Sequence, residues 1–221
     1  MLRSLAIQES DIGPDLRHVE VYTMGGLLSL LWHGESGANG MVITGGGAMG
    51  SLLGPAGGLF HDLAVELWSD HGIGTIRVGY RQPNNLEECV LDLCAAADLA
   101  VRAGSERFIA MGHSFGGAVA VGAGIALPEY VAGVVTLATQ SAGCEQAELL
   151  HPRPILLFHG DRDELLPVMC SEVVSELAGG GEVVILPGTG HLLSEAGDEI
   201  RSRLRQWIPA TLATPAPSAS A

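Results

Sequence analysis

Short runs of β-branched and aliphatic residues alternate with longer stretches rich in Ala and Leu along most of the chain. This alternation is typical of an α/β protein with a mainly parallel sheet, because helical crossovers join consecutive parallel strands. The first two strands, joined by residues 24–26, are expected to pair as an antiparallel hairpin. The predicted strands are 18–23, 27–33, 41–44, 75–80, 107–111, 133–138, 154–159 and 182–186, and the predicted helices are 57–71, 86–103, 115–127, 168–179 and 194–207. The pattern therefore predicts a mainly parallel sheet of eight strands flanked by helices.

The length of the chain, 221 residues without an internal repeat, indicates a single folded domain. We expect this domain to span residues 17–209, after an N-terminal segment of residues 1–16. Residues 210–221 are small, uncharged and rich in Pro, and they offer too little apolar surface to order themselves. They are therefore predicted to form a disordered C-terminal tail.

The charge balance excludes several classes of function. The chain has 25 acidic residues against 11 basic ones, a net charge of −14, and every basic residue is Arg. Without Lys there can be no Schiff-base lysine, Ser–Lys dyad or P-loop lysine. An acidic chain without a basic run is also repelled by phosphate backbones and anionic lipid, so neither nucleic acid nor a membrane is an expected partner.

Cysteine spacing and the N-terminus bear on metal binding and location. The four Cys residues form no CxxC pair and no Cys/His cluster with zinc spacing, which indicates buried thiols and no metal site. The first residues lack the apolar run of a signal peptide, and no apolar run near them is long enough to cross a bilayer. A cytoplasmic protein that needs no cofactor is the expectation.

The first candidate for chemistry is a GxSxG pattern at residues 112–116, centred on Ser114. It lies between a predicted strand and a predicted helix rich in small residues. A serine at such a sharp turn needs small neighbours, which Gly112, Gly116 and Gly117 supply, and its hydroxyl stands above the sheet at a helix N-terminus. An ordinary glycine-rich turn is the alternative.

A serine hydroxyl becomes a strong nucleophile only beside a base that a carboxylate orients. Two acids, Asp161 and Asp163, follow the predicted strand 154–159, and His191 follows the predicted strand 182–186. Loops that leave the carboxyl ends of parallel strands share one edge of the sheet, so the three side chains can converge. The residues alone leave the choice between the two acids open.

The chain resembles the α/β-hydrolase superfamily from about residue 18 to residue 207. Three motifs match in order, GHSFGG at 112–117, HGDRDELLP at 159–167 and PGTGHLL at 187–193. The resemblance implies the α/β-hydrolase fold, with Ser114 as nucleophile and His191 as base. In that superfamily the acid is typically the aspartate four residues before the proline of the second motif, which is Asp163 here. Asp161 then shapes the turn or pairs with Arg162.

Acyl transfer also needs N–H donors aimed at the oxyanion of the tetrahedral intermediate. One should be the backbone N–H of Phe115, the residue after the nucleophile. The other should come from the loop after the predicted strand 41–44, where Gly46 and Gly47 are the candidates. Hydrolases of this kind usually carry His-Gly at this point, and this sequence has no His there. A phosphate-binding loop is disfavoured, since no Lys follows and the next helix starts several residues later.

The superfamily often inserts a helical lid between the predicted strands 133–138 and 154–159, where this chain has only a short connection. We therefore expect no cap domain and an open, shallow pocket. The pattern looks most like the dienelactone-hydrolase and small carboxylesterase branch, although dienelactone hydrolases carry Cys where this chain has Ser114. Arg81, after the predicted strand 75–80, could hold a substrate carboxylate, or it could pair with an acid and brace its loop.

These residues predict a serine hydrolase that cleaves short-chain carboxylic esters through an acyl-enzyme intermediate, with a small-molecule ester as its partner. A thioesterase or an amidase would use the same three side chains, because leaving-group preference depends on pocket shape. A hydrolase-fold protein that binds a small ligand without turnover is a further alternative.

Overall fold

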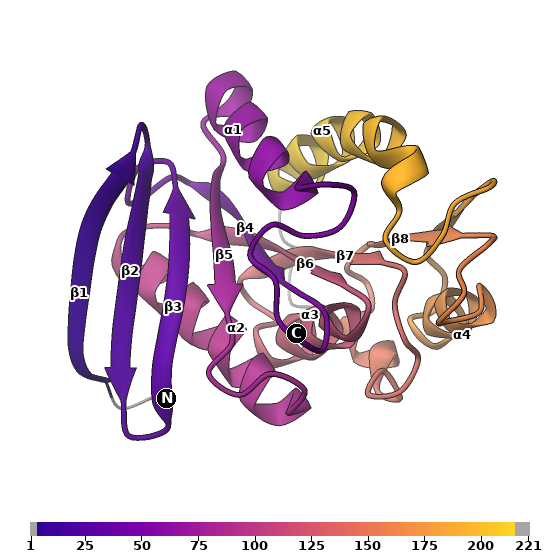
Figure 1. Cartoon of the computed structure of the whole chain (residues 1–221), viewed down its shortest axis with the longest axis horizontal. Helices are drawn as coiled ribbons and strands as arrows, with labels where there is room; N and C mark the ends of the chain where they lie inside the picture. The colour runs from indigo at the N-terminus through magenta and orange to yellow at the C-terminus, as the bar shows by residue number, and fades with distance from the viewer. Residues whose placement is uncertain (1–3, 215–221) are drawn as a thin grey trace, which may run out of the picture.

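A computed structural model describes residues 4–214 and contains a sheet of nine strands. The spatial order is β1-β2-β3-β5-β4-β6-β7-β8-β9 (Figure 1). The strands from β4 to β9 are parallel, β1, β2 and β3 form an antiparallel meander, and β3 joins the parallel part beside β5. The strands are β1 (Ser4–Gly13), β2 (Leu16–Thr23), β3 (Gly26–His33), β4 (Gly40–Gly45), β5 (Gly74–Gly79), β6 (Arg107–His113), β7 (Val131–Leu137), β8 (Ile155–Gly160) and β9 (Glu182–Leu186).

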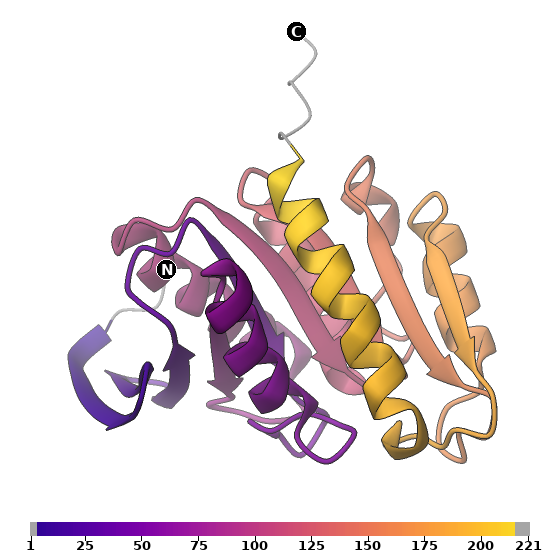
Figure 2. The ribbon, with the colours of Figure 1, turned by 90° about the horizontal axis from the view of Figure 1, so that it is seen from above.

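Five α-helices cover the two faces of this sheet, as Figure 2 shows from above. They are α1 (Leu59–His71), α2 (Leu86–Arg102), α3 (Phe115–Ala126), α4 (Met169–Leu177) and α5 (Gly197–Ala213), with short 3₁₀ helices η1 (Ala147–Leu150) and η2 (Ser194–Ala196). Helices α1 and α5 pack on one face through aliphatic residues spaced one helical turn apart, such as Leu63 and Leu67 or Leu204 and Ile208. Helices α2, α3 and α4 cover the other face.

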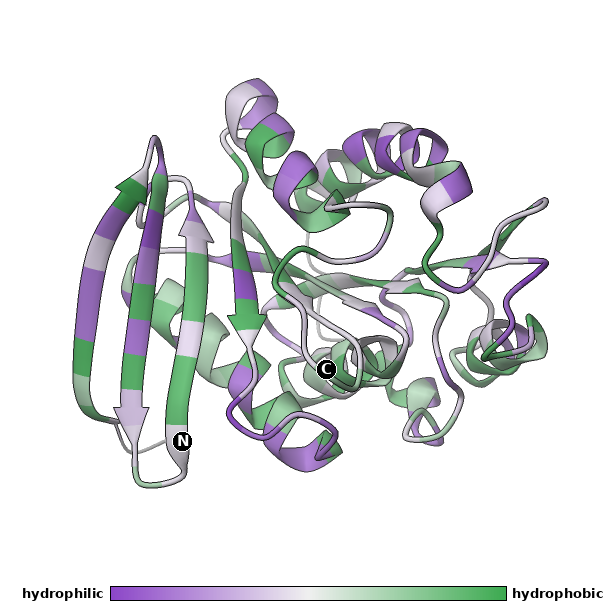
Figure 3. Ribbon diagram, in the orientation of Figure 1, coloured by the Kyte–Doolittle hydropathy of each residue, from purple (hydrophilic) through white to green (hydrophobic). Residues whose placement is uncertain are grey.

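The burial of the strands follows their place in the sheet. All seven residues of β7 are buried, as parallel strands covered on both faces require. The outer strand β2 is less buried, and all ten residues of β1 are exposed. Apolar residues run through the central strands and α3, whereas polar residues interrupt β1 and β2 (Figure 3). The well-packed region is therefore the parallel part of the sheet.

The mainly parallel α/β architecture without a cap domain is confirmed, and each predicted helix and strand is present. The expectation of eight strands was wrong by one, because residues 4–13 of the expected N-terminal segment form β1 against β2. The only continuous apolar run in that segment is the short stretch Leu5-Ala6-Ile7, which is exposed, and the strand pairs with β2 along its backbone. At the other end, α5 continues to Ala213, past the expected boundary at residue 209, while residues 215–221 of the expected tail lie outside the described residues.

Two further observations concern the described part of the chain. No helix there is both long enough and apolar enough to cross a membrane. The four cysteines are unpaired, with Cys89 and Cys144 buried and Cys94 and Cys170 half-buried.

Candidate active site

Ser114 lies at the turn from β6 to α3, in a backbone conformation that non-glycine residues rarely adopt. Its φ is 57° and its ψ is −121°. A residue with a Cβ atom is strained there, and such strain persists only where the surroundings fix the backbone. The backbone N–H of Ser114 donates to the carbonyl of Leu137 at 2.8 Å, which ties the turn to the end of β7.

The glycines around Ser114 are required by close backbone approach. A Cβ atom added at Gly112 would overlap the carbonyl of Gly116 in the first turn of α3. A Cβ atom added at Gly116 would overlap the carbonyl oxygens of Gly45, the last residue of β4, and of Gly46, the first residue of the loop after it. The sequence-based expectation that this turn needs small neighbours therefore has a specific steric cause.

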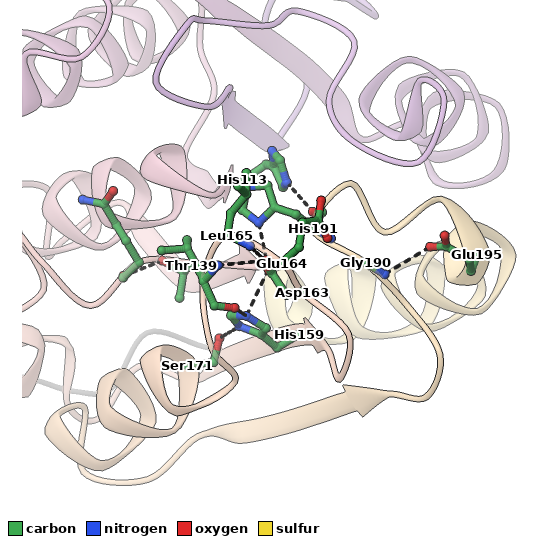
Figure 4. Close-up of polar contacts among 12 residues, drawn as sticks. His113, Thr139, His159, Asp163, Glu164, Leu165, Ser171, Gly190, His191 and Glu195 are labelled. Atoms are coloured by element: carbon green, nitrogen blue, oxygen red, sulfur yellow. Dashed lines mark hydrogen bonds and ion pairs between the residues drawn. The ribbon is translucent and has the colours of Figure 1, made fainter.

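Asp163 and His191 meet although 27 residues separate them along the chain (Figure 4). The loop after β8 carries Asp163, and its Oδ2 lies 2.7 Å from Nδ1 of His191 on the loop after β9. This distance is within hydrogen-bond reach, about 3.2 Å or less. Asp161 lies elsewhere and accepts a hydrogen bond from the backbone N–H of Gly188 at 2.6 Å. Of the two acids that the sequence left open, Asp163 contacts the imidazole.

The surroundings of Asp163 favour its charged form. Burial opposes ionisation, but the N–H of Leu166, the imidazole of His191 and the N–H of Leu165 outweigh it and lower the pKa of the carboxyl group. Both N–H groups donate to Oδ1 at 2.8 Å, so Oδ2 is left to face the imidazole. His159 lies on the other side, with Nε2 3.3 Å from Oδ2 (Figure 4). Asp163 is thus held as an oriented carboxylate.

His113 is a component of the site that the sequence analysis did not single out. Its Nε2 lies 3.0 Å from the backbone carbonyl of His191, and the two rings are 5.0 Å apart between centroids. Burial, with a smaller contribution from the nearby His191, lowers the pKa of His113 to about 4. A neutral His113 therefore donates to the His191 backbone at neutral pH. The feature of the sequence that points to His113 is its position directly before Ser114 in the GxSxG pattern.

The serine and the imidazole share one edge of the sheet without a hydrogen bond between them. Among residues 4–214, Ser114 Oγ has no hydrogen-bond partner. His191 is held from two sides, by Asp163 at its ring and by His113 at its backbone. Catalytic hydrogen bonds are often long without substrate and shorten in the complex.

The glycine loop after β4 lies beside Ser114. The position of a Cβ atom at Gly47 is 3.9 Å from Cβ of Ser114, in ordinary contact, whereas at Gly46 it would overlap the backbone of Ser51. Gly47 therefore borders the nucleophile more directly than Gly46. In the described part of the chain, the backbone N–H groups of Gly47 and Phe115 have no acceptor, which leaves both available to a ligand oxygen.

The guanidinium of Arg81 is bonded to acidic side chains of the protein and is not available to a ligand. Its Nε donates to Oδ1 of Asp92 at 2.5 Å and its Nη2 to Oε2 of Glu88 at 2.6 Å, both from α2. Only 3% of its side chain is exposed. The placement favours the bracing of the loop after β5, which the sequence left as an alternative, over the binding of a substrate carboxylate.

The surface around these residues is open and partly apolar. Leu165 and Leu192, next to the Asp163 and His191 backbone, are 68% and 62% exposed, and Met49 on the glycine loop is 91% exposed. A cavity of about 380 Å³ lies at the opposite edge of the sheet, lined by Arg107, Tyr130 and Trp207 among others. Among residues 4–214, no cluster of three or more His, Cys, Asp or Glu side chains is arranged to hold a metal ion.

Comparison with solved structures identifies the fold. The chain is similar to a dienelactone hydrolase from Anabaena variabilis, with a TM-score of 0.75, 20% identity, and coverage of 92% of this chain and 98% of that one. It is also similar to Est1E from Butyrivibrio proteoclasticus, at a TM-score of 0.73, 15% identity, and 89% and 99% coverage. A further similar structure is a monoacylglycerol lipase from Paleococcus ferrophilus, with a TM-score of 0.63, 17% identity, and coverage of 83% of this chain and 99% of that one.

These likenesses, with the sheet order described above, show that the chain has the α/β-hydrolase fold. No protein-family model matches the sequence, and no curated protein matches it by sequence.

Proposed function

We propose that this protein is a serine hydrolase that cleaves carboxylic esters, with Ser114 as nucleophile, His191 as general base and Asp163 as the acid that orients the imidazole. One observation carries the proposal: the 2.7 Å contact between the Asp163 carboxylate and Nδ1 of His191 lies at the same sheet edge as a strained serine. A carboxylate at Nδ1 keeps Nε2 free to accept a proton.

The proposed reaction has two halves. Ser114 Oγ attacks the ester carbonyl carbon while its proton moves to His191 Nε2, and the carbonyl oxygen becomes an oxyanion beside the N–H groups of Phe115 and the glycine loop. The C–O bond then breaks, and His191 returns the proton to the leaving alcohol. A water molecule releases the acyl group as a carboxylic acid by the same steps and restores Ser114. The contact between Ser114 and His191 forms when the substrate binds.

The surroundings favour an uncharged substrate with a short acyl group. Arg81 is engaged by Asp92 and Glu88, so no free guanidinium from this loop awaits a carboxylate. Leu165 and Leu192 are apolar but exposed, and exposed side chains do not wall a channel. Each methylene buried on binding contributes about 0.8 kcal/mol of binding free energy, and an open site buries only the first few carbons of the acyl chain.

This substrate preference is tested with p-nitrophenyl esters from acetate to palmitate. We expect kcat/KM to be highest at roughly two to six acyl carbons, because additional methylenes of a longer chain would stay in solvent and add no binding energy. A steady rise to long chains would contradict the open site and leave the triad assignment standing. A matched thioester and anilide would show whether the same residues serve a thioesterase or an amidase better.

A non-catalytic ligand-binding protein is the second candidate, favoured by the missing hydrogen bond between Ser114 and His191. Labelling by a fluorophosphonate probe separates the two, because only an activated serine reacts. We expect the wild type to be labelled and to hydrolyse p-nitrophenyl acetate, and Ser114→Ala to do neither. A wild type that stays unlabelled supports the binding protein, and labelling that survives the substitution moves the nucleophile elsewhere.

A further inference from the structure

An oxyanion hole works only if its N–H donors are fixed before the reaction. One side of the proposed hole is the end of β4 and the loop after it, where three glycines, 45–47, follow one another: Gly45 ends the strand and the next two begin the loop. Glycine is the residue with the largest conformational freedom, so this backbone needs external contacts to hold one orientation. Within the loop, the N–H of Gly50 donates to the carbonyl of Gly47 at 2.8 Å and closes a turn. This bond does not fix the peptide between Gly46 and Gly47.

Tyr80 makes that missing contact. It follows β5, is 8% exposed, and its hydroxyl donates to the carbonyl of Gly46 at 3.1 Å. Burial raises the pKa of the phenol, which keeps the hydroxyl protonated and therefore a donor. A Cβ atom at Gly45 would overlap this hydroxyl, so the sequence of the loop is adapted to the position of Tyr80.

The same side chain also contacts the other half of the proposed hole. The ring of Tyr80 packs edge-on against the ring of Phe115, with 6.4 Å between centroids and an angle of 84°. Phe115 begins α3 and carries the backbone N–H expected to be the first oxyanion donor. One buried tyrosine thus contacts both backbone segments that would bind the oxyanion.

The bond to Gly46 also selects the second donor. The Gly46 carbonyl and the Gly47 N–H belong to one planar trans peptide and point in opposite directions. Tyr80 holds the carbonyl on its own side, so the Gly47 N–H points away from Tyr80. Gly47 lies next to Ser114, as the 3.9 Å distance from its Cβ position shows.

We infer that Tyr80 is a positioning residue that fixes the Gly46–Gly47 peptide and so presents the Gly47 N–H as the second oxyanion donor. The inference rests on the proposed ester hydrolysis. Loss of one oxyanion donor costs about 10²–10³-fold in kcat, and loss of its orientation alone should cost less, about 10–100-fold.

Tyr80→Phe is the sharpest variant, because it keeps the ring against Phe115 and removes only the hydroxyl. Tyr130→Phe is the matched control, since that tyrosine packs on Phe108 at the opposite edge of the sheet and, within the described residues, its hydroxyl has no hydrogen-bond partner. Hydrolysis of p-nitrophenyl acetate is measured per serine labelled by the fluorophosphonate, so that unfolded protein does not count. Inhibition by a trifluoromethyl ketone, whose adduct carries an oxyanion, is measured in parallel.

The expected result is a kcat lower by about 10–100-fold in Tyr80→Phe, a KM within twofold of the wild type, and inhibition by the ketone weakened in proportion to kcat/KM. Tyr130→Phe should match the wild type. An active wild type with unchanged Tyr80→Phe kinetics would overturn the inference and leave the proposed function intact. An equal loss in both variants, or a loss that appears only in KM, would overturn it as well. A wild type without Ser114-dependent hydrolysis would remove the proposed function and the inference together.

Discussion

The two edges of the parallel sheet build their turns from different residues. At the carboxyl edge, positive φ angles occur at non-glycine residues after five of the parallel strands, namely Ala56, Asn84, Ser114, Ala138 and Leu193. At the amino edge, within residues 4–214, the turns into the parallel strands place only glycines at positive φ, as at Gly37, Gly72, Gly104 and Gly179. Asp15, the sixth non-glycine case, lies in the hairpin between β1 and β2.

This difference teaches where the molecule keeps strain. A glycine adopts positive φ without steric cost, so the turns at the amino edge carry no backbone strain from this source. A non-glycine residue at positive φ, as at the carboxyl edge, costs about 1–3 kcal/mol and persists only where the surrounding structure fixes that backbone conformation. The cavity lined by Tyr130 and Trp207 lies at the relaxed amino edge, and the candidate triad lies at the strained carboxyl edge. Strained backbone and paired charged groups therefore mark the candidate site, whereas this apolar cavity lies away from it.

The largest effect should come from Asp163. Replacing it with Asn keeps the shape but favours the wrong imidazole tautomer, so we expect kcat to fall by about 10⁴-fold with the fold intact. Asp161→Asn is the matched control two residues away, where the carboxylate holds the Gly188 N–H and we expect a much smaller loss. Ester kinetics with circular dichroism checks both. Equal losses in the two variants would mean that this loop acts through its structure alone.

The second effect concerns stability in acid. The folded pKa of His113 is lowered to about 4, below the ordinary value of 6.5, so the unfolded chain binds this proton more readily. The stability that the neutral ring contributes is complete above pH 6.5 and is lost as the pH falls toward 4. At pH 4.5 the loss should be about 2–3 kcal/mol.

His113→Gln removes this titration and keeps a side-chain N–H for the His191 carbonyl. The free energy of unfolding, measured in urea at pH 7.5 and pH 4.5, should differ less between the two pH values in the variant than in the wild type, by about 2–3 kcal/mol. The same difference in both proteins would show that His113 is protonated in the folded state, contrary to its burial.

A third and smaller effect tests the two edges directly. Ser114→Gly should raise the free energy of unfolding by about 1 kcal/mol, because it removes the Cβ strain at a φ of 57° while abolishing activity. Ser114→Ala keeps the Cβ atom and should leave stability unchanged. Gly72→Ala at the amino edge, where φ is 64° and an added Cβ has no neighbour within 4 Å, should lower the free energy of unfolding by about 1 kcal/mol. If Ser114→Gly and Gly72→Ala changed the free energy of unfolding in the same direction, the proposed difference in strain between the two edges would be wrong.

The sequence predicted the parallel part of the fold well, because buried parallel strands are continuous apolar runs and their helices are amphipathic. It missed β1, which pairs with β2 along its backbone and has no buried face, because its apolar residues Leu5, Ile7 and Ile12 are all exposed. The end of α5 at Ala213 was also missed, since the Ala/Thr composition after Pro209 reads as a loop although Thr211 packs against the protein.

Within the site, the order of the motifs predicted that an acid after one strand meets His191, and the resemblance to the α/β-hydrolase superfamily pointed to Asp163 as that acid. The roles of His113 and Tyr80 could not be read from the sequence in the same way. Both act through bonds to backbone carbonyls far along the chain, at His191 and Gly46, and such contacts leave no spacing rule. Arg81 was ambiguous for a similar reason, because its partners Asp92 and Glu88 are visible only once α2 is packed.

The smallest effect should come from the cavity at the amino edge. Its volume of about 380 Å³ is large enough for a small ligand, and Trp207 and Tyr130 give it apolar walls, so it is the alternative ligand site to test. Yet it lies at the opposite edge of the sheet from Ser114, and Ala210 lines it from α5. Ala210→Leu narrows the cavity with a residue that favours helix formation, so we expect kcat/KM for p-nitrophenyl acetate within twofold of the wild type and little change in stability. Gly47→Ala is the matched step at the carboxyl edge, since its added methyl fits sterically but stands 3.9 Å from Cβ of Ser114, and there we expect a clear loss of activity. If Ala210→Leu lowered kcat/KM tenfold while Gly47→Ala did not, substrate would be bound at the amino edge. Backbone strain would then not mark the active site of this protein.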